Sequence, residues 1–452
     1  MVGAVFPAEA ADWLWPDQAL ARILARAEPL PPGACPLEDA NGLVLARAVA
    51  ARVTLPPWNN AGMDGYALRA SEMGASDLET LPPDGIPFPV VGEVLPGGPL
   101  PEPPPPGAAV RIMTGAPLPA GLDSVVRVED TDREAGEPGV VRILRTRDRG
   151  RNVRPQGEDM HAGDLLLEAG EVITPGRAAL LASAGCDPVP VVPRPRVSLL
   201  PTGDELRRPS DFQDVLAGRA IPESNGPMLA AACRAIGVPV RLHPPARDER
   251  GALRRALEAA AAEADVLITL GGASMGTGDL VKSVLDELGF RLDFWRIRMR
   301  PGSPVSFGLL PRTGGQRPLP VLGLPGNPAS AFTGFQLLAR PLLLALSGRR
   351  RIHRPVVSAR AGTPLPAHPD RTLFPRVRMD RDREGRRVAV SAAPQGSGLV
   401  RGLGEAQGFA VVPAGSSCPT GTPVTVILLE DGPGDGADPG YFDALRVTEE
   451  AP

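Results

Sequence analysis

The chain has 452 residues, which is enough for about three or four compact units, and 43% of them are hydrophobic, so large cores can be buried. The formal net charge of -4 and the sequence pI of about 5.8, without a long basic block, argue against a nucleic-acid-binding face. Since neither a run of 18 apolar residues nor a basic, signal-like start occurs, we expect a cytoplasmic protein that binds no membrane.

Cysteine, histidine and lysine are scarce. The four cysteines lie far apart without a CxxC pair, so neither disulfides nor a zinc site is expected. The four histidines also lack metal-ligand spacing. Lys282 is the only lysine, so nearly all 48 basic residues are arginines, as genome-wide codon bias would produce.

The first predicted element is an amphipathic helix within residues 12–28. Leu20, Ile23 and Leu24 share one face after a Pro16-Asp17 start, and we expect this helix to open an N-terminal unit. A second helical segment, residues 172–185, follows a Val-rich stretch. We therefore predict an elongated N-terminal domain formed by residues 1–52 and 147–193, with an insertion between its two parts.

The insertion, residues 53–146, consists of short Val-rich runs separated by Gly and Pro turns, which predicts a small all-β module. Its string PLPEPPPPG (99–107) is expected to form a stiff surface turn. A proline-rich ligand for another domain is the alternative for this segment.

The central third, residues 194–350, predicts a doubly wound α/β domain. Apolar runs without alternation indicate parallel strands buried on both faces, and the segments between them have helical period. We expect strands at 197–201, 238–242, 265–270 and 319–323, and helices near 226–236 and at 249–263, 279–289 and 328–346. Because ligands bind beyond the carboxyl ends of such strands, one pocket is expected there.

Short Val-rich runs return from residue 355, so residues 355–435 are predicted to form a small C-terminal β domain, followed by a polar tail at 436–452. The predicted fold class is thus multidomain α/β plus β, with the α/β domain in the centre and the β module inserted into the N-terminal domain.

Carboxylates follow the predicted strands. Glu205 and Asp248 lie just beyond two of them, and Asp279 ends the loop GGASMGTGD. Each could simply cap a turn or a helix, but together they exceed what capping requires. Carboxylate oxygens are ligands that Mg²⁺ prefers, so we predict a metal site that includes Asp248 and Asp279.

The same loop contains a candidate phosphate site. Gly271 and Gly272 let the backbone approach a ligand closely, while Ser274 and the amides that follow suit an oxyanion. A plain turn is the alternative reading of this loop.

A basic run, FWRIRMRPGSP (294–304), carries Arg296, Arg298 and Arg300 at alternate positions. Along a strand these side chains would share one face, and arginine forks bind tetrahedral oxyanions. A solvated basic strand is the alternative.

Seven strings occur in order along the chain: NNAGMDGYA, RIMTGAPLP, RNVRPQGEDM, PTGDEL, GGASMGTGD, RPGSP and LPGNPAS. Together they resemble the molybdopterin molybdenumtransferase family, which includes bacterial MoeA and the E domains of gephyrin and its plant counterpart. The resemblance covers roughly residues 12–430. It implies a four-part, molybdopterin-binding subunit that forms a homodimer with shared active sites, and other cofactor-biosynthesis proteins as further candidate partners.

The resemblance also implies a reaction. Family members take molybdopterin adenylate and molybdate, cleave the pyrophosphate link with a divalent metal, here Mg²⁺, and transfer molybdenum to the dithiolene. The implied catalytic residues are Asp64, Thr114, Asp159, Glu205, Asp248 and Asp279, with Asp64 and Thr114 supplied by the partner subunit. The implied substrate-binding residues are Gly271, Gly272, Ser274, Arg296, Arg300, Ser303, Pro325, Gly326, Asn327, Pro328, Arg376 and Ser397.

Some positions depart from the family pattern. Arg296 and Arg300 replace lysines and keep the charge, but Ser303 replaces the lysine of a Pro-Gly-Lys-Pro turn. The family's Ser-Asn-Arg segment ends in Gly226. With two cations lost, a non-catalytic molybdopterin-binding protein or carrier is the alternative function. A nucleotide-binding α/β hydrolase unrelated to molybdenum is a third reading.

Overall fold

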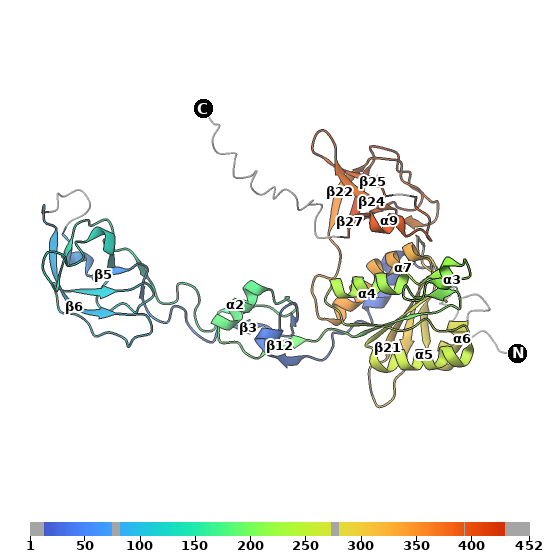
Figure 1. The fold of residues 1–452 in the computed structure, drawn as a ribbon, viewed down its shortest axis with the longest axis horizontal. Coiled ribbons are helices and arrows are strands. Elements are labelled where there is room, and N and C mark those ends of the chain that lie inside the picture. The colour runs from blue at the N-terminus through green and yellow to red at the C-terminus, as the bar shows by residue number, and fades with distance from the viewer. Residues whose placement is uncertain (1–12, 75–81, 273–279, 393, 430–452) are drawn as a thin grey trace.

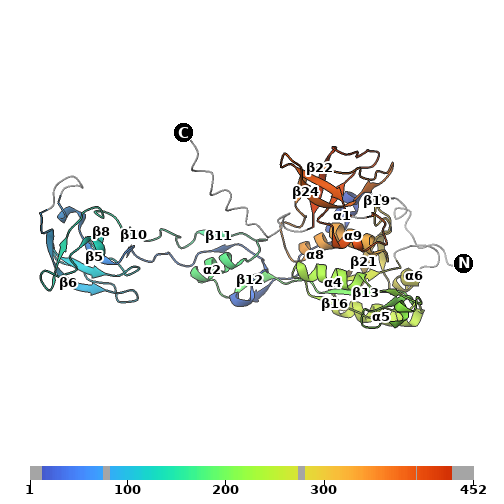
Figure 2. The ribbon, with the colours of Figure 1, turned by 45° about the horizontal axis from the view of Figure 1, so that its top comes forward.

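The computed structural model describes residues 13–74, 82–272, 280–392 and 394–429. The molecule is elongated, with a β module at one end, a small N-terminal unit in the middle, and an α/β domain with a β-barrel at the other end (Figures 1 and 2). This arrangement confirms the predicted multidomain α/β plus β fold.

The N-terminal unit combines two small antiparallel sheets with helix α2 (Pro175–Ser183). One sheet has the order β1 (Gly33–Cys35), β12 (Val189–Val192), β2 (Val44–Leu45), and the other pairs β3 (Val49–Ala50) with β11 (Leu165–Leu167). Thr174 caps α2, since its hydroxyl accepts a hydrogen bond from the amide of Arg177, and Pro175 supplies the first turn. A separate apolar core holds this unit together.

The inserted β module is a five-stranded sheet in the order β8-β5-β7-β6-β9. Its strands are β5 (Gly65–Leu68), β6 (Ile86–Val94), β7 (Ala109–Ile112), β8 (Ser124–Arg127) and β9 (Val140–Ile143). The chain enters and leaves it through the antiparallel pair β4 (Asn60–Ala61) and β10 (Val153–Arg154). The module therefore joins the N-terminal unit through two adjacent extended segments, as Figure 2 shows.

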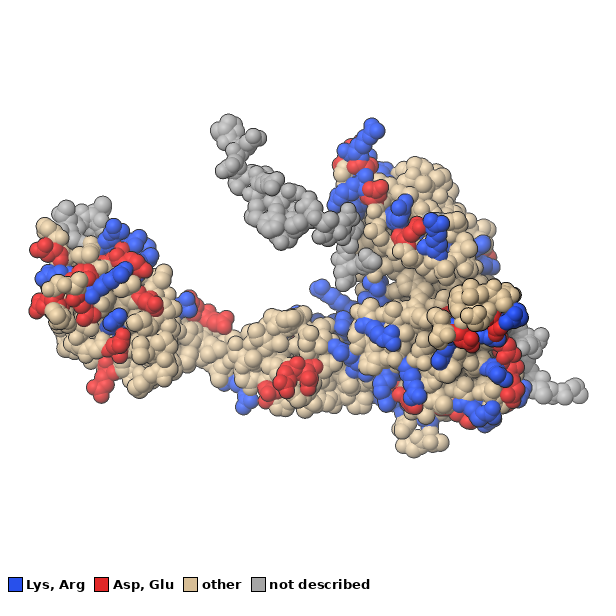
Figure 3. All heavy atoms as spheres, in the orientation of Figure 1, with Lys and Arg blue, Asp and Glu red and all other residues tan. Residues whose placement is uncertain are grey.

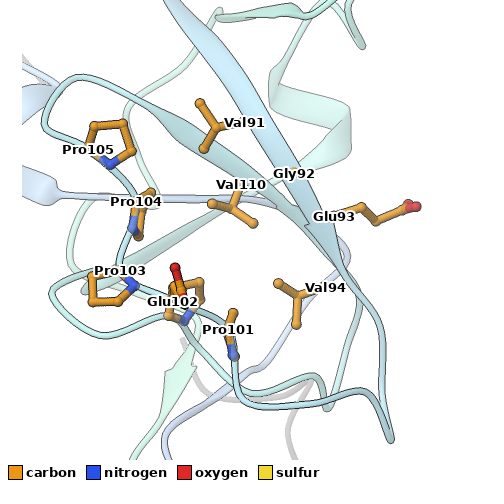
Figure 4. A pocket seen from close by; sticks show the side chains of 11 residues that line it. Val91, Gly92, Glu93, Val94, Pro101, Glu102, Pro103, Pro104, Pro105 and Val110 are labelled. Atoms are coloured by element: carbon orange, nitrogen blue, oxygen red, sulfur yellow. The ribbon is translucent and has the colours of Figure 1, made fainter.

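The proline-rich segment lies along the outside of this module. Prolines 101 and 103–105 line a pocket of about 330 Å³ over β6 and β7 (Figure 4). The guanidinium of Arg69 donates to the carbonyls of Pro104 and Pro105, at 2.8 and 3.1 Å. These bonds fasten the segment to its own module, which favours the predicted stiff surface turn.

The α/β domain has a six-stranded sheet in the order β16-β13-β17-β21-β20-β18. Its strands are β13 (Val197–Pro201), β16 (Val240–Leu242), β17 (Val266–Leu270), β18 (Arg291–Phe294), β20 (Ser306–Leu310) and β21 (Leu319–Leu324). The first four in spatial order are parallel, β20 runs antiparallel to β21, and β18 runs antiparallel to β20. The sheet is thus mixed, and the all-parallel sheet expected from the sequence is corrected.

Helices cover both faces of this sheet, as a doubly wound fold requires. One face carries α4 (Asn225–Ala235) and the run of α7 (Pro328–Gly334), a π-helical turn (Phe335–Ala339) and α8 (Arg340–Leu346), and the other carries α5 (Arg250–Glu263) and α6 (Leu280–Glu287). Successive residues of β17 alternate between the two cores, which explains their unbroken apolar run. Short elements β14 (Leu206–Arg207), α3 (Gln213–Leu216) and β15 (Ile221–Pro222) follow β13.

The run Pro328–Leu346 is long and apolar enough to cross a membrane by length and composition. However, 78% of its apolar window is buried, and its side chains form part of the α/β core. It is therefore a core helix of this domain.

Helix α1 (Pro16–Leu24) also belongs to the α/β domain. Its buried residues Ala19 and Ile23 pack in the same core as the sheet, and Leu14 bridges to Ile297. From the sequence we expected this helix in the N-terminal unit, and that expectation is wrong. Its amphipathic pattern predicts a buried face but does not specify which core covers that face.

The C-terminal domain is a closed barrel in the order β22-β25-β24-β26-β27. Its strands are β22 (Val356–Ala361), β24 (Arg376–Arg381), β25 (Arg387–Ser391), β26 (Gly408–Val411) and β27 (Pro423–Leu428), with helix α9 (Arg401–Gly404) before β26. Backbone pairing and aromatic packing help to dock it on the α/β domain. Strand β23 (Thr372–Leu373) pairs with β19 (Met299–Arg300), and Phe409 contacts Phe332 of α7 edge to face at 6.0 Å.

We predict that Phe409→Ala weakens this docking. Phe409 is fully buried in the core shared by the two domains, so its truncation should cost about 3 to 5 kcal/mol. Calorimetric unfolding of the full chain should show the loss of stability as a lower unfolding temperature. The matched control is Phe212→Ala, because Phe212 is 37% exposed and its truncation should cost at most about 0.5 kcal/mol. Equal effects of the two changes would contradict the docking role.

Candidate active site

The loops after the parallel strands converge at one edge of the sheet. The amide of Gly271, just after β17, donates to the carbonyl of Leu324 at the end of β21 (3.0 Å). Gly271 has a φ of +101°, and a Cβ there would lie 2.9 Å from the carbonyl oxygen of Thr202, beyond β13. Since a side chain fits neither the space nor the backbone conformation, only glycine lets these loops approach so closely.

The loop after β21 is held from the neighbouring helix. The side-chain amide of Asn225, at the start of α4, donates to the carbonyl of Gly326 at 2.7 Å. Asn327 occupies the N-cap position of α7 and Pro328 its first turn, so Pro325 to Pro328 form a rigid connection from strand to helix. The buried oxygen of the Asn225 amide has no hydrogen-bond partner in the described part of the chain.

Two carboxylates lie together just beyond β13 and β16, on the opposite side of β17 from β21. The amide of Asp204 donates to the carboxylate of Asp248 at 3.4 Å, and the amide of Asp248 donates to that of Asp204 at 3.3 Å. Glu205 follows, exposed, with its carboxylate beside Gly203. No arginine or lysine of the described segments lies within 4.0 Å of these three carboxylates, so their charges are available to a cation.

Asp279, the other predicted metal ligand, lies outside the described residues, as does Ser274 of the predicted phosphate site. Gly272 of that phosphate site is the last described residue before the gap and has a φ of +63°. Among the described side chains, no group of three His, Cys, Asp or Glu residues converges as a metal site would require. The pair Asp204–Asp248 is the nearest approach to one at this edge.

The basic run lies at the same edge. Because β20 runs antiparallel to β21 and β18 antiparallel to β20, the connection 295–305 returns to the carboxyl ends of the parallel strands. The sequence predicted one continuous strand here, and that prediction is wrong. Strand β18 ends at Phe294, and regular pairing resumes only at Met299. The cause is a local bridge in which Leu14 pairs with Ile297.

Tryptophans hold the arginines of this connection. The guanidinium of Arg296 lies 3.7 Å from the ring centre of Trp295 and 5.5 Å from that of Trp13, and the guanidinium of Arg298 lies 5.4 Å from that of Trp15. No carboxylate of the described residues lies within 4.0 Å of Arg296, Arg298 or Arg300. Cation–π contacts thus orient Arg296 and Arg298 without neutralising them.

Arg376 has a buried guanidinium with two nitrogens that lack hydrogen-bond partners among the described residues. It is fully buried, and its Nη2 donates to the carbonyls of Pro394 and Gly396, at 3.0 and 3.3 Å. Nε and Nη1 have no hydrogen-bond partner within the described ranges. Burial lowers the pKa of this guanidinium, but an arginine stays charged at neutral pH. Because leaving a buried cation with unused donors unpaired is costly, this side chain is suited to an anion.

The neighbours of Arg376 connect it to the sheet edge. The carbonyl of Ser397, one residue beyond Gly396, accepts a hydrogen bond from the amide of Ala329 in α7 (3.0 Å). The turn that contains Gly302 packs closely against α7, since a Cβ on Gly302 would lie 3.3 Å from the carbonyl oxygen of Ser330. The barrel, the turn at 301–304 and the start of α7 therefore meet at one place.

Three predicted residues lie elsewhere in the molecule. The carboxylate of Asp64 accepts hydrogen bonds from the amide and the hydroxyl of Thr114, both at 2.7 Å, in the β module. Asp159 lies on the connection to that module, where its amide donates to Leu55. The narrow middle of the molecule separates the module from the α/β domain (Figure 3), and no hydrogen bond or ion pair between described residues joins Asp64 or Thr114 to the α/β loops.

The two departures from the family pattern have local explanations. The Ser303 hydroxyl donates to the carbonyl of Met299 at 2.6 Å, within its own turn. The amide of Gly226 donates to the buried carboxylate of Glu223, and a Cβ on Gly226 would lie 2.6 Å from that carboxylate and from Leu242. Burial raises the pKa of Glu223, and its carboxylate fills the space that a larger residue at 226 would need.

The sequence reading missed several residues of this site. Asp204 is adjacent to the predicted Glu205, yet it is Asp204 that pairs with Asp248. Trp13 and Trp15 lie near the start of the chain, and Arg371 precedes β23; their contacts with residues 296–303 join segments far apart in sequence. Only Trp295, which lies within the basic run, offered a signal of cation–π packing.

Comparison with known proteins places this geometry in a family. The chain matches models of the MoeA N-terminal region (domain I and II) over residues 14–185, of a probable molybdopterin binding domain over 198–345, and of the MoeA C-terminal region (domain IV) over 358–429. Molybdopterin molybdenumtransferase 1 of Mycobacterium tuberculosis is 33% identical over 431 residues, which cover 91% of this chain and 98% of that protein. The chain belongs to the molybdopterin molybdenumtransferase (MoeA) family.

Other relatives agree with this assignment. Molybdopterin molybdenumtransferase 2 of Mycobacterium tuberculosis is 34% identical over 84% of this chain and 90% of that protein. The structure of a molybdopterin biosynthesis MoeA protein of Pyrococcus horikoshii superposes with a TM-score of 0.77 at 29% identity, covering 93% of this chain and 100% of that one. The chain is accordingly a transferase of molybdenum cofactor biosynthesis, and the predicted resemblance is confirmed.

We predict that Thr114→Val raises the pKa of Asp64 toward its ordinary range. The Thr114 hydroxyl bond, followed by the Thr114 amide bond, holds this pKa below that range, and valine removes the first of the two. Carbon-detected NMR titration of the aspartate carboxyls would measure the change. Thr363→Val is the control, because that hydroxyl bonds to the amide of Ser391 in the barrel. An Asp64 titration unaltered by Thr114→Val would contradict the proposed coupling.

Proposed function

We propose that this chain inserts molybdenum from molybdate into molybdopterin, with hydrolysis of molybdopterin adenylate. The observation that carries the proposal is the buried Arg376, whose Nε and Nη1 have no partner among the described residues. Its Nη2 donates to the carbonyl of Gly396, next to Ser397, which is bonded to the start of α7. A tetrahedral oxyanion and a phosphoanhydride would thus have adjacent sites.

The acidic end of the edge suits the phosphoanhydride. Mg²⁺ commonly binds through one or two carboxylates, waters and substrate phosphates, and the unpaired carboxylates Asp204 and Asp248 fit that requirement. Asp248 and Asp279 would hold the ion, with Asp204 and Glu205 beside them. Bound there, Mg²⁺ would offset the negative charge that develops on the pyrophosphate as it is cleaved. Gly272, which is exposed, would let the phosphates approach the backbone of this loop closely.

The basic end suits molybdate. Arg296, Arg300 and Arg376 contribute permanent charges, and each guanidinium presents donors in a fork that matches a tetrahedral oxyanion. Proximity of the two ends would let the molybdenum oxyanion meet the dithiolene while the adenylate leaves, without diffusion between sites.

We further propose that the site is completed in a homodimer. Asp64, Thr114 and Asp159 would approach the α/β edge of the partner subunit, because their own edge lies across the narrow middle of the molecule. A cytoplasmic location, and contact with other cofactor-biosynthesis proteins, would accord with this role.

The alternative, a non-catalytic molybdopterin-binding protein or carrier, rests on the cations missing at Ser303 and Gly226. Molybdate-dependent turnover of molybdopterin adenylate by the purified chain decides between them. Release of AMP and formation of molybdenum cofactor support the transferase. Binding of molybdopterin adenylate without either product supports the carrier.

We predict that Asp248→Asn lowers metal-dependent turnover by on the order of 100-fold, because the amide keeps the size but loses the charge that binds the cation. The measurement is AMP release at limiting Mg²⁺. Asp211→Asn is the matched control, since Asp211 is exposed in the same domain and makes no side-chain hydrogen bond to a described residue. Full activity of Asp248→Asn under these conditions would rule out the metal role.

A mixing experiment tests the shared site. Asp64→Ala and Asp248→Ala proteins should each be nearly inactive, but a mixed dimer contains one site without either substitution, so mixing should restore part of the activity. Subunit exchange is followed by a mass-tagged partner. If exchange is demonstrated and no activity returns, the site does not span two subunits.

A further inference from the structure

The turn at Ser303 is the place where this chain lacks the family's cation, and its hydroxyl does not replace that cation. The hydroxyl proton is donated to the carbonyl of Met299 at 2.6 Å. The oxygen accepts a hydrogen bond from Nη1 of Arg371 at 3.4 Å. Ser303 is therefore a support for a neighbouring guanidinium, and its own proton is already used.

Backbone pairing brings Arg371 to this turn. The residue directly precedes β23, which pairs in parallel with β19, so that Thr372 lies opposite Met299. The amide of Thr372 donates to the carbonyl of Arg298 (3.0 Å), and the amide of Phe374 donates to that of Arg300 (2.9 Å). Arg371 is thus fixed beside the Pro-Gly-Ser-Pro turn although 68 residues separate it from Ser303.

The charge of Arg371 is oriented and only weakly compensated. Its guanidinium lies 5.0 Å from the ring centre of Trp13, the same ring that faces Arg296. Its Nε is buried without a hydrogen-bond partner among the described residues. Among the described residues, the nearest carboxylate oxygen belongs to Asp370, 3.9 Å away, and that oxygen lies 2.6 Å from the His368 ring.

We infer that Arg371 supplies, at the turn of residue 303, the cation for the oxyanion that the missing lysine would have supplied. Ser303 and Trp13 position it: a serine leaves room for the guanidinium and accepts its hydrogen bond, and the indole holds its plane. The inference rests on the proposed function, since the oxyanion is the molybdate of that reaction.

The test is calorimetric titration of sodium molybdate into the purified full chain at low ionic strength, without molybdopterin. We expect Arg371→Gln to weaken molybdate binding by about tenfold, the scale of one charge-assisted contact. Arg371→Lys, which keeps the charge, should lose about threefold or less. Arg378→Gln is the control, an exposed arginine on β24 that should bind as the unaltered chain does.

A double substitution makes the test specific to this turn. Ser303→Lys should restore most of the binding lost in Arg371→Gln, but should improve the unaltered chain by less than about threefold, because the cation is already present there. Equal improvement in both backgrounds, or unchanged binding in Arg371→Gln, would overturn the inference. Absence of molybdate binding by the unaltered chain would overturn both this inference and the proposed function, so the two failures are distinguishable.

Discussion

The site depends on how the barrel is docked against the α/β domain. Strand β23 adds to β19 through only two residue pairs, but Phe374, Phe409 and Leu429 of the barrel are buried in the same core as the sheet. Burying side chains of this size stabilises a contact by about 1.5 to 3 kcal/mol each, enough to fix the pairing register. With that register fixed, Arg371 lies beside Ser303, at the carboxyl edge of a sheet to which it does not belong.

Charge is sorted along this edge. Carboxylates follow β13 and β16 at one end, the glycine loop lies after β17, and the arginines follow from the antiparallel strands and the barrel. Neither set is neutralised by the other within the described residues, so both keep unpaired charge. Ligands that need a cation at one end and arginine forks at the other would match these two sets, and an adenylate with an adjacent oxyanion has that arrangement.

The domain architecture was largely predictable, because strands buried on both faces leave unbroken Val, Leu and Ile runs and turns leave Gly and Pro. The loops carrying Gly271, Asp248 and Pro325–Pro328 followed from the same runs. What the sequence could not supply was pairing between distant segments. The bridge of Leu14 to Ile297 breaks the strand expected through Arg296, and it carries α1 into the α/β core. Arg371 lies in no motif, and only the β19–β23 register places it beside Ser303.

We propose that the unused donors of Arg376 face an oxyanion site at the carboxyl edge. Crystals of the full chain soaked in tungstate, a heavy tetrahedral analogue of molybdate, would test this by anomalous scattering. We expect a peak within hydrogen-bond distance of Nε or Nη1 of Arg376, beside the turn at 301–304. A peak elsewhere, with those two nitrogens bonded to protein groups, would contradict it.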